Sequence, residues 1–174
     1  MARRTIKNSK KILIFVGIVL AIVIADQASK HMIVSSIAIN HGIQVLPGYV
    51  DIVHVRNKGA AFGFLSQSSW NLRSTLFLVV HFVALVVILR LLASTKDPDP
   101  YLLGGYSLFF AGALGNLIDR LRLGEVIDFL DVHIGNAHWP AFNVADSAIC
   151  VGVALLVLAW RKTETSKNHV ADTA

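Results

Sequence analysis

Acidic and amide side chains gather in one short stretch, residues 115–148, between two strongly apolar segments. Two carboxylates stand out: Asp128 has apolar residues on both sides, and Asp146 opens the following apolar segment. A charged group at the edge of a bilayer is costly and is therefore a functional candidate. Two carboxylates brought together in a low-dielectric site do not both ionise easily, so one can donate a proton while the other accepts one. Such a pair can activate water for peptide hydrolysis without a metal ion or a covalent intermediate.

A structural role competes with catalysis for the second carboxylate. Pro140, Asn143 and Asp146 form the pattern of a helix start, with Asn143 as N-cap and an acid three residues later, close to a capping box. Capping and catalysis are compatible, because the helix dipole favours an ionised Asp146 there. Asp131, which follows Asp128 by three residues, could be a simple surface acid.

Two further sets of polar residues have the spacing of one helix face. Asp26 and Lys30 are four residues apart in the order that favours an ion pair, which would fix one helix against a polar site. Asn116, Asp119 and Arg120 lie on roughly one face of another predicted helix. They could be interhelical contacts with a snorkelling arginine, or they could belong to the site.

The composition indicates an integral membrane protein. Of the 174 residues, 55% are hydrophobic and only 16% are charged, against about 25% in soluble proteins. The mean hydropathy is +0.62. Basic residues cluster at positions 3–11 and 161–167, on the flanks of apolar segments, which favours membrane orientation over nucleic-acid binding. The single cysteine, Cys150, excludes a disulfide framework within the chain.

Four apolar segments are long enough to span a bilayer. Their basic flanks place both termini in the cytoplasm. The third segment contains Gly112 and Gly115, which allow another helix to approach closely. A cleaved leader is the alternative for the first segment, but no small-x-small site follows its apolar core. The predicted spans cover about residues 12–33, 72–93, 101–120 and 142–160.

The two outer connections differ in pattern. Residues 40–68 include a Pro-Gly turn followed by period-2 alternation, which predicts one or two short strands at the membrane surface. Residues 121–140 form the second connection on the outer side and are expected to be a loop. We therefore predict a single membrane domain, residues 1–174. Its fold class is an all-α integral membrane protein, with four transmembrane helices and a small extracytoplasmic β-rich subdomain.

Other chemistries have little support in the sequence. No HExxH or GxSxG motif occurs, so zinc-peptidase and serine-hydrolase sites are not expected. His133 and His138 are five residues apart with no obvious third ligand, and we expect no metal. His81 and Trp70 are interpreted as packing and interfacial residues. A small transporter or proton-coupled channel, or a non-enzymatic assembly factor, remains the alternative to an enzyme, since intramembrane polar residues also serve transport.

Five ordered blocks resemble the signature blocks of bacterial lipoprotein signal peptidase, signal peptidase II. They are DQASK (26–30), NKGAAFGFL (57–65), GNLIDR (115–120), VIDF (126–129) and FNVAD (142–146). The resemblance implies that Asp128 and Asp146 are the catalytic pair. It also implies supporting or substrate-binding roles for Asp26, Lys30, Asn57, Gly59, Asn116, Asp119, Arg120 and Asn143.

The resemblance further implies an intramembrane aspartyl endopeptidase that uses no cofactor. Its substrates would be prolipoproteins carrying a diacylglyceryl-modified cysteine, cut on the N-terminal side of that cysteine. It would act in the bacterial inner membrane, near the outer leaflet, in contact with membrane lipids, and globomycin, a cyclic peptide, would inhibit it. We expect a monomer with no nucleic-acid partner, and we hypothesise that residues 57–65 form a flexible clamp over the site.

Overall fold

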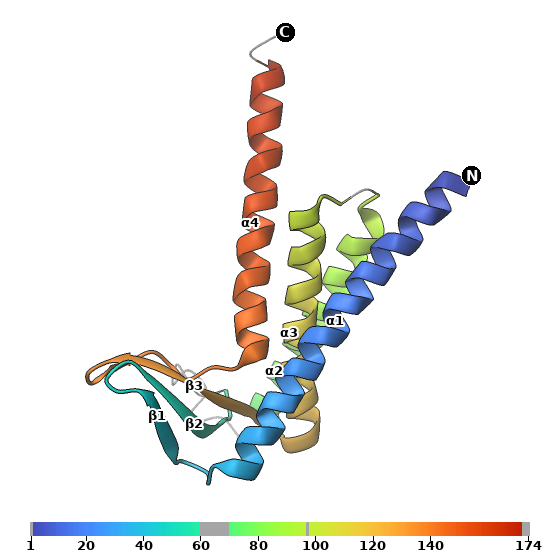
Figure 1. The fold of residues 1–174 in the computed structure, drawn as a ribbon. Coiled ribbons are helices and arrows are strands. Elements are labelled where there is room, and N and C mark those ends of the chain that lie inside the picture. Colours follow the sequence, from blue (N-terminus) through green and yellow to red (C-terminus); the bar gives the residue numbers. More distant parts are fainter. Residues whose placement is uncertain (1, 60–69, 97, 172–174) are drawn as a thin grey trace.

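Four long helices dominate the structure, a computed structural model (Figure 1). It describes residues 2–59, 70–96 and 98–171, with side chains for residues 8–59, 75–96 and 98–162. Each helix contains a stretch long and apolar enough to cross a membrane, which confirms the predicted fold class. The helices are α1 (Ala2–Ser36), α2 (Trp70–Ser94), α3 (Pro100–Leu123) and α4 (Val144–Ala171).

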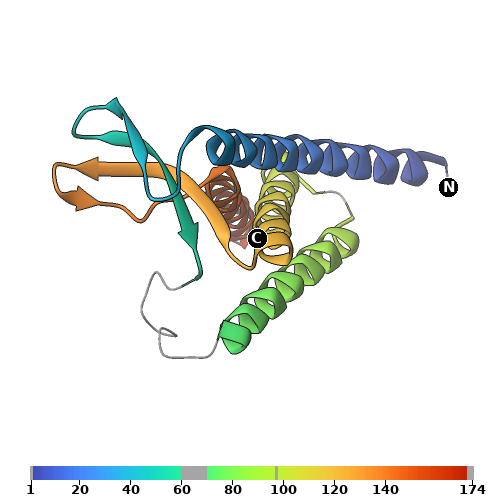
Figure 2. The ribbon, with the colours of Figure 1, turned by 90° about the horizontal axis from the view of Figure 1, so that it is seen from below.

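Helix α3 is the central helix and packs against the other three (Figure 2). In its apolar window 56% of residues are buried, against 11–22% in the other helices, whose apolar outer faces are left for lipid. The predicted close approach at its glycines is confirmed. A Cβ at Gly112 would collide with the backbone oxygen of Ala145, and one at Gly115 would lie 2.7 Å from an Asp26 carboxylate oxygen. These two glycines therefore let α1 and α4 reach α3 at the level of the polar residues.

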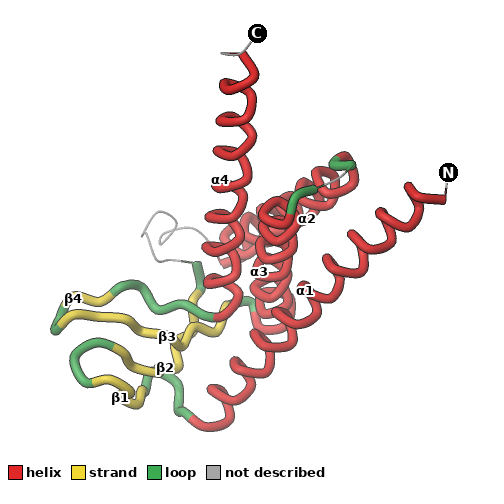
Figure 3. Tube along the Cα trace, turned by 45° about the horizontal axis from the view of Figure 1, so that its top comes forward, coloured by secondary structure: helices red, strands yellow, loops and turns green. Residues whose placement is uncertain are grey.

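A small antiparallel sheet follows the order β1-β2-β3-β4 (Figure 3). Strands β1 (Gly42–Leu46) and β2 (Val50–Asn57) lie within the stretch predicted to be β-rich. Strands β3 (Val126–Ile134) and β4 (Ala137–His138) lie where an outer loop was expected, so that expectation was wrong. The first four residues of β3, 126–129, are all buried on both faces of the strand, so this half of β3 lacks the exposed–buried alternation of a surface strand. Pairing with β2, far away in the sequence, makes it a strand.

The strand alternation predicted for β2 is interrupted. Its register against β3 shifts between Ile52 and Val55, as in a β-bulge. The simple alternation of faces along β2 therefore does not continue past this shift. This irregularity precedes Asn57, which closes the strand opposite Val126. The strand ends of β2 and β3 therefore meet beside the polar stretch.

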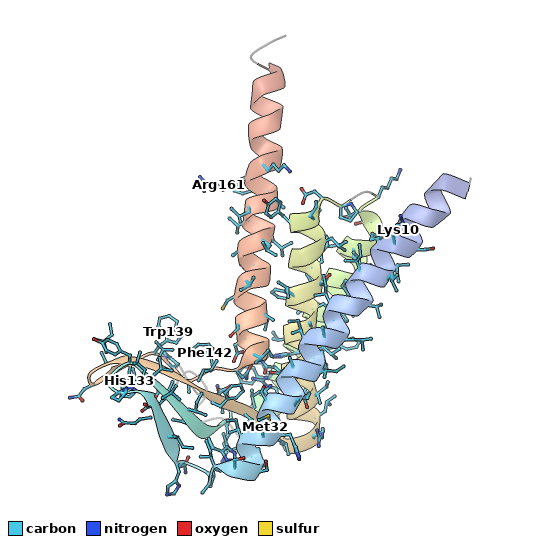
Figure 4. The ribbon with its side chains drawn as sticks, viewed as in Figure 1. Lys10, Met32, His133, Trp139, Phe142 and Arg161 are labelled. Carbon is cyan, nitrogen blue, oxygen red and sulfur yellow. The ribbon has the colours of Figure 1, made fainter. Side chains whose placement is uncertain are left out.

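The sheet and the two termini lie at opposite ends of the helices (Figure 1). Lys10 and Arg161 lie toward the terminal end, whereas Met32, His133, Trp139 and Phe142 lie toward the sheet (Figure 4). The hypothesised clamp, residues 57–65, falls outside the described residues beyond Gly59.

Candidate active site

A buried lysine joins α1 to α3 at the sheet end of the helices. The ammonium nitrogen of Lys30 lies 2.8 Å from Asp26 Oδ2, which confirms the predicted ion pair. It lies equally close, 2.8 Å, to Asp119 Oδ2 on α3, and donates to Asn116 Oδ1 at 3.2 Å. None of these four side chains is more than 4% exposed. One cation is thus shared by two buried carboxylates, so removing it would leave both without their counter-charge.

Each of those carboxylates also positions a segment that carries a candidate catalytic residue. Asp26 Oδ1 accepts a hydrogen bond of 2.9 Å from the backbone nitrogen of Ala145, in the first turn of α4. Asp119 Oδ2 accepts one of 3.3 Å from the backbone nitrogen of Ile127, next to Asp128 on β3. The ion cluster therefore fixes the start of α4 and the start of β3 relative to α1 and α3.

Gln27 belongs to this cluster and was missed by the sequence reasoning. Its Nε2 donates to Asp119 Oδ1 at 2.9 Å, to Asp26 Oδ2 at 3.1 Å and to the backbone oxygen of Gly115 at 3.3 Å. The available signal was its polar side chain directly after Asp26, at the end of a purely apolar run, residues 12–25. Helical spacing concealed it, because adjacent residues on a helix point in different directions.

Asn143 and Asp146 cap α4 reciprocally. The backbone nitrogen of Asp146 donates to Asn143 Oδ1 at 2.9 Å, and the backbone nitrogen of Asn143 donates to Asp146 Oδ2 at 3.2 Å. This is the capping-box arrangement that the sequence predicted, with an aspartate in the third position. Asp146 Oδ1 accepts a further hydrogen bond of 2.7 Å from Asn116 Nδ2. Its carboxylate lies at the positive end of the helix dipole, which favours a negative charge there.

The amide nitrogen of Asn143 points to the other carboxylate. It donates to Asp128 Oδ1 at 2.7 Å, and Asn116 Oδ1 and the backbone oxygen of Ile127 lie 3.2 Å away. Asn143 is fully buried. One side chain therefore contacts Asp128 through its nitrogen and the backbone of Asp146 through its oxygen.

Asp128 is almost completely buried, at 2% exposure. Its second oxygen accepts a hydrogen bond of 2.9 Å from Asn57 Nδ2. Burial raises the pKa of Asp128 from 3.8 to about 6, and the negative charge of Asp146 adds to that effect. Hydrogen bonds from Asn57 and Asn143, and the charge of Lys30, act in the opposite direction. Asp128 is therefore a carboxyl group that can hold a proton near neutral pH.

Gly59 fixes the amide orientation of Asn57. Its backbone nitrogen donates to Asn57 Oδ1 at 2.7 Å, which leaves the amide nitrogen of Asn57 for Asp128. Gly59 has φ of 78°, a left-handed conformation that glycine adopts without strain.

The predicted site residues therefore come together from five elements, α1, α3, α4, β2 and β3. Arg120 joins them from the last turns of α3, where its Nη1 donates to the backbone oxygen of Asn116 at 3.4 Å. The amide nitrogens of Asn57 and Asn143 donate to Asp128, and that of Asn116 donates to Asp146. The structure thus gives these amides a supporting position around the carboxylates.

The histidines of the sheet lie apart from this group. His133 and His138 stack with ring centroids 4.5 Å apart, and His138 Nδ1 lies 3.0 Å from both oxygens of Asp131. Asp131 thus has a histidine partner. No group of three possible metal ligands occurs in the part of the chain that the structure describes.

Known proteins resemble this chain over most of its length. The family model described as signal peptidase (SPase) II matches residues 18–161. A lipoprotein signal peptidase of Oleidesulfovibrio alaskensis is 49% identical over 148 residues, which cover 84% of this chain and 94% of that protein. One of Geobacter sulfurreducens is 48% identical over 154 residues, covering 88% of this chain and 95% of that protein.

A solved structure shows the same fold. It is described as a bacterial membrane enzyme studied by the in meso method at 2.3 Å, and it matches with a TM-score of 0.77 and 35% sequence identity. The match covers 88% of this chain and 90% of the solved chain. The sequence blocks, the family match over most of the chain and the shared fold lead to one conclusion: this chain belongs to the signal peptidase II family.

Proposed function

We propose that Asp128 and Asp146 carry out the peptidase reaction of this family in the present chain. The substrates are prolipoproteins whose cysteine carries a diacylglyceryl group, and the cut falls on the N-terminal side of that cysteine. The relatives are named lipoprotein signal peptidases, which supports this substrate class. The observation that carries the assignment is Asn143, which binds the Asp128 carboxylate and caps the helix turn of Asp146.

The surroundings of the two carboxylates suggest different roles for them. Asp146 accepts hydrogen bonds from Asn116 and from a backbone nitrogen at the start of α4, so it suits the ionised general base that takes a proton from water. Asp128 has its pKa raised to about 6 by burial, so it suits the general acid that donates to the scissile carbonyl. Water adds to the carbonyl carbon while Asp146 takes a proton from it and Asp128 gives its proton to the carbonyl oxygen. The C–N bond of the tetrahedral intermediate then breaks, Asp146 gives its proton to the leaving amine nitrogen, and Asp128 takes back a proton from the hydroxyl that becomes the new carboxyl group. We expect this chemistry to need neither a metal nor a cofactor.

The ion cluster of Lys30, Asp26 and Asp119 supports the pair through the backbone beside it and through Asn116, which binds both Lys30 and Asp146. Lys30 neutralises much of the charge of Asp26 and Asp119, and those two carboxylates hold the backbone next to Asp146 and Asp128. We assign these residues a positioning role. Arg120 supplies a positive charge that attracts Asp146, Asp128 and Asp119, so it can stabilise negative charge in the transition state.

The distribution of charge supports an orientation in the bacterial inner membrane. Lys10 and Arg161 lie toward the end of the helices that carries both termini (Figure 4), and cytoplasmic flanks are enriched in basic residues. Trp139 and Ile134, 69% and 75% exposed, lie in the sheet region at the other end and suit a membrane–water interface. We therefore place both termini in the cytoplasm and the site near the outer leaflet, in contact with lipid.

This location suits a lipid-anchored substrate. The acyl chains of the modified cysteine keep the substrate in the outer leaflet, at the level where the two carboxylates lie. A helical signal peptide hides its scissile carbonyl in backbone hydrogen bonds, so it must unwind locally near polar groups that can satisfy the freed donors and acceptors. All residues of the proposed site come from one chain, so we expect the monomer to be active.

The test is cleavage of a lipidated prolipoprotein by the purified protein in lipid vesicles. The expected products are the free signal peptide and a protein that begins with the modified cysteine, both identified by mass. Globomycin should block the reaction, and the same precursor without its diacylglyceryl group should remain largely uncut. Ion or solute flux across the vesicles without any peptide cleavage would instead favour the transporter alternative.

A further inference from the structure

Helix α2 holds the guanidinium of Arg120. The Nη1 atom of Arg120 lies 3.4 Å from Nε2 of His81, and the guanidinium carbon lies 5.0 Å from the centroid of the Phe77 ring. Phe77 and His81 are four residues apart and therefore share one face of α2. Together with the backbone oxygen of Asn116, they contact the guanidinium on its edge and on its face.

These contacts define the hydrogen positions on the His81 ring. Nδ1 lies 2.7 Å from the backbone oxygen of Phe77, one helical turn earlier. A carbonyl oxygen can only accept, so Nδ1 carries a hydrogen and donates it. Arginine can only donate, so Nε2 must present its lone pair to Arg120. Both contacts are satisfied by the neutral ring with its hydrogen on Nδ1.

Phe77 also contacts the segment that follows β2. The backbone at Gly59 packs so tightly against the Phe77 ring that a Cβ there would overlap it. Gly59 in turn orients Asn57, whose amide binds Asp128. The face of α2 formed by Phe77 and His81 therefore reaches both the Asp128 side of the site and Arg120.

The positive charge of Arg120 attracts the carboxylates of Asp146, Asp128 and Asp119, so the position of its guanidinium affects both members of the catalytic pair. The arginine side chain is long and flexible, so a guanidinium without further contacts could turn away from the catalytic carboxylates toward other acceptors. We propose that His81 is a positioning residue for the peptidase reaction, which together with Phe77 holds the Arg120 guanidinium toward the two carboxylates. This inference rests on the proposed function, because it assigns His81 a role in that reaction.

Two substitutions separate the hydrogen-bond acceptor from the bulk of the side chain. His81→Leu fills similar space but cannot accept from Arg120, whereas His81→Gln restores an acceptor oxygen on a side chain of similar reach. Losing one hydrogen bond to a charged group should lower kcat about tenfold in His81→Leu. KM should change by less than about twofold, because the interaction acts in the transition state. His81→Gln should recover most of the rate.

The control on the same helix is Phe82→Leu. Phe82 is 64% exposed on the apolar surface, so this change should leave kcat and KM unaltered. Rates are compared per folded protein, with thermal unfolding measured for each variant. In an Arg120→Lys background, His81→Leu should cause little further loss, because the residue on which it acts is already changed.

A measurement independent of activity is ¹⁵N NMR of the histidine rings. It should show His81 as a neutral ring with the hydrogen on Nδ1, and Arg120→Lys should shift its Nε2 signal. An unchanged kcat in His81→Leu, a His81→Gln variant as slow as His81→Leu, or fully additive effects with Arg120→Lys would overturn the proposal. If no variant or native protein cleaves lipidated substrate, the proposed function fails, whereas the NMR result still decides whether His81 holds Arg120.

Discussion

Asn143 makes two different hydrogen bonds, one that caps α4 and one to Asp128. Replacing Asn143 with serine or with alanine separates their effects. Its Oδ1 caps α4 by accepting from the backbone of Asp146, while its Nδ2 donates to Asp128. Serine keeps a capping oxygen and alanine does not, but both remove the amide donor and leave nearly the same space. The two variants should therefore differ in free energy of unfolding but shift the pKa of Asp128 equally.

The magnitudes follow from the contacts. A serine cap is about 1 kcal/mol more stabilising than alanine, so Asn143→Ser should exceed Asn143→Ala in free energy of unfolding by that amount. The lost donor is a 2.7 Å hydrogen bond to a carboxylate. Such bonds contribute about 1.5–3 kcal/mol, and about 1.4 kcal/mol corresponds to one pH unit in a titration. Without it the pKa of Asp128 rises further, since this bond favours the ionised form.

The assay is the pH profile of kcat/KM for cleavage of a lipidated prolipoprotein. With Asp128 as general acid, activity of the native protein should fall as pH rises through about 6, where Asp128 loses its proton. In both Asn143 variants this alkaline limb should move up by about one to two pH units, with a lower maximum. An alkaline limb at the native position in both variants would refute the reasoning, as would equal stability of the serine and alanine proteins.

The remaining predictions concern charge, packing and protonation. Lys30→Met should lower the free energy of unfolding in detergent by about 3–5 kcal/mol, because two buried carboxylates lose their cation; a loss below about 1 kcal/mol would contradict the shared-cation description. Gly112→Ala should destabilise the protein and slow cleavage by pushing Ala145 away from α3, whereas Gly17→Ala, with nothing within 4 Å, should be tolerated; equal behaviour in thermal unfolding would count against the close packing. The folded pKa of Asp128, about 6, exceeds its ordinary value of 3.8, so its contribution to stability is complete below about pH 3.8 and is lost as pH rises through 6. Compared with Asp128→Asn, the native protein should therefore gain up to about 3 kcal/mol in free energy of unfolding between pH 7 and pH 4, and parallel pH dependences would exclude the raised pKa.

Features that depend on nearby residues could be predicted from the sequence. The four helices follow from apolar length alone, since a bilayer requires about 20 apolar residues whatever the fold. The ion pair of Asp26 with Lys30 and the capping box of Asn143 with Asp146 each lie within four residues of chain. Local helix geometry determines both interactions, so residue spacing alone was enough to predict them.

Features that depend on distant residues could not be predicted. The first four residues of strand β3 are all buried, so the start of the strand gives no alternating signal, and its pairing with β2 depends on residues far away in the sequence. Gln27 gains its role from Asp119, 92 residues away, and His81 gains its role from Arg120, 39 residues away. A polar residue in a membrane helix signals that a partner exists, but it does not say which one.

The most direct test of the central claim is single-turnover cleavage of a lipidated prolipoprotein by Asp128→Asn and Asp146→Asn proteins. Asp131→Asn is the matched control, because Asp131 lies on the same strand as Asp128 but pairs with His138. We predict that each of the first two variants folds and inserts into vesicles yet loses at least about a thousandfold in rate, consistent with the loss of an acid or base that acts as part of a pair. The Asp131→Asn protein should cleave at a rate close to native. Turnover near the native rate in either folded Asp128→Asn or folded Asp146→Asn protein would contradict the two-carboxylate mechanism.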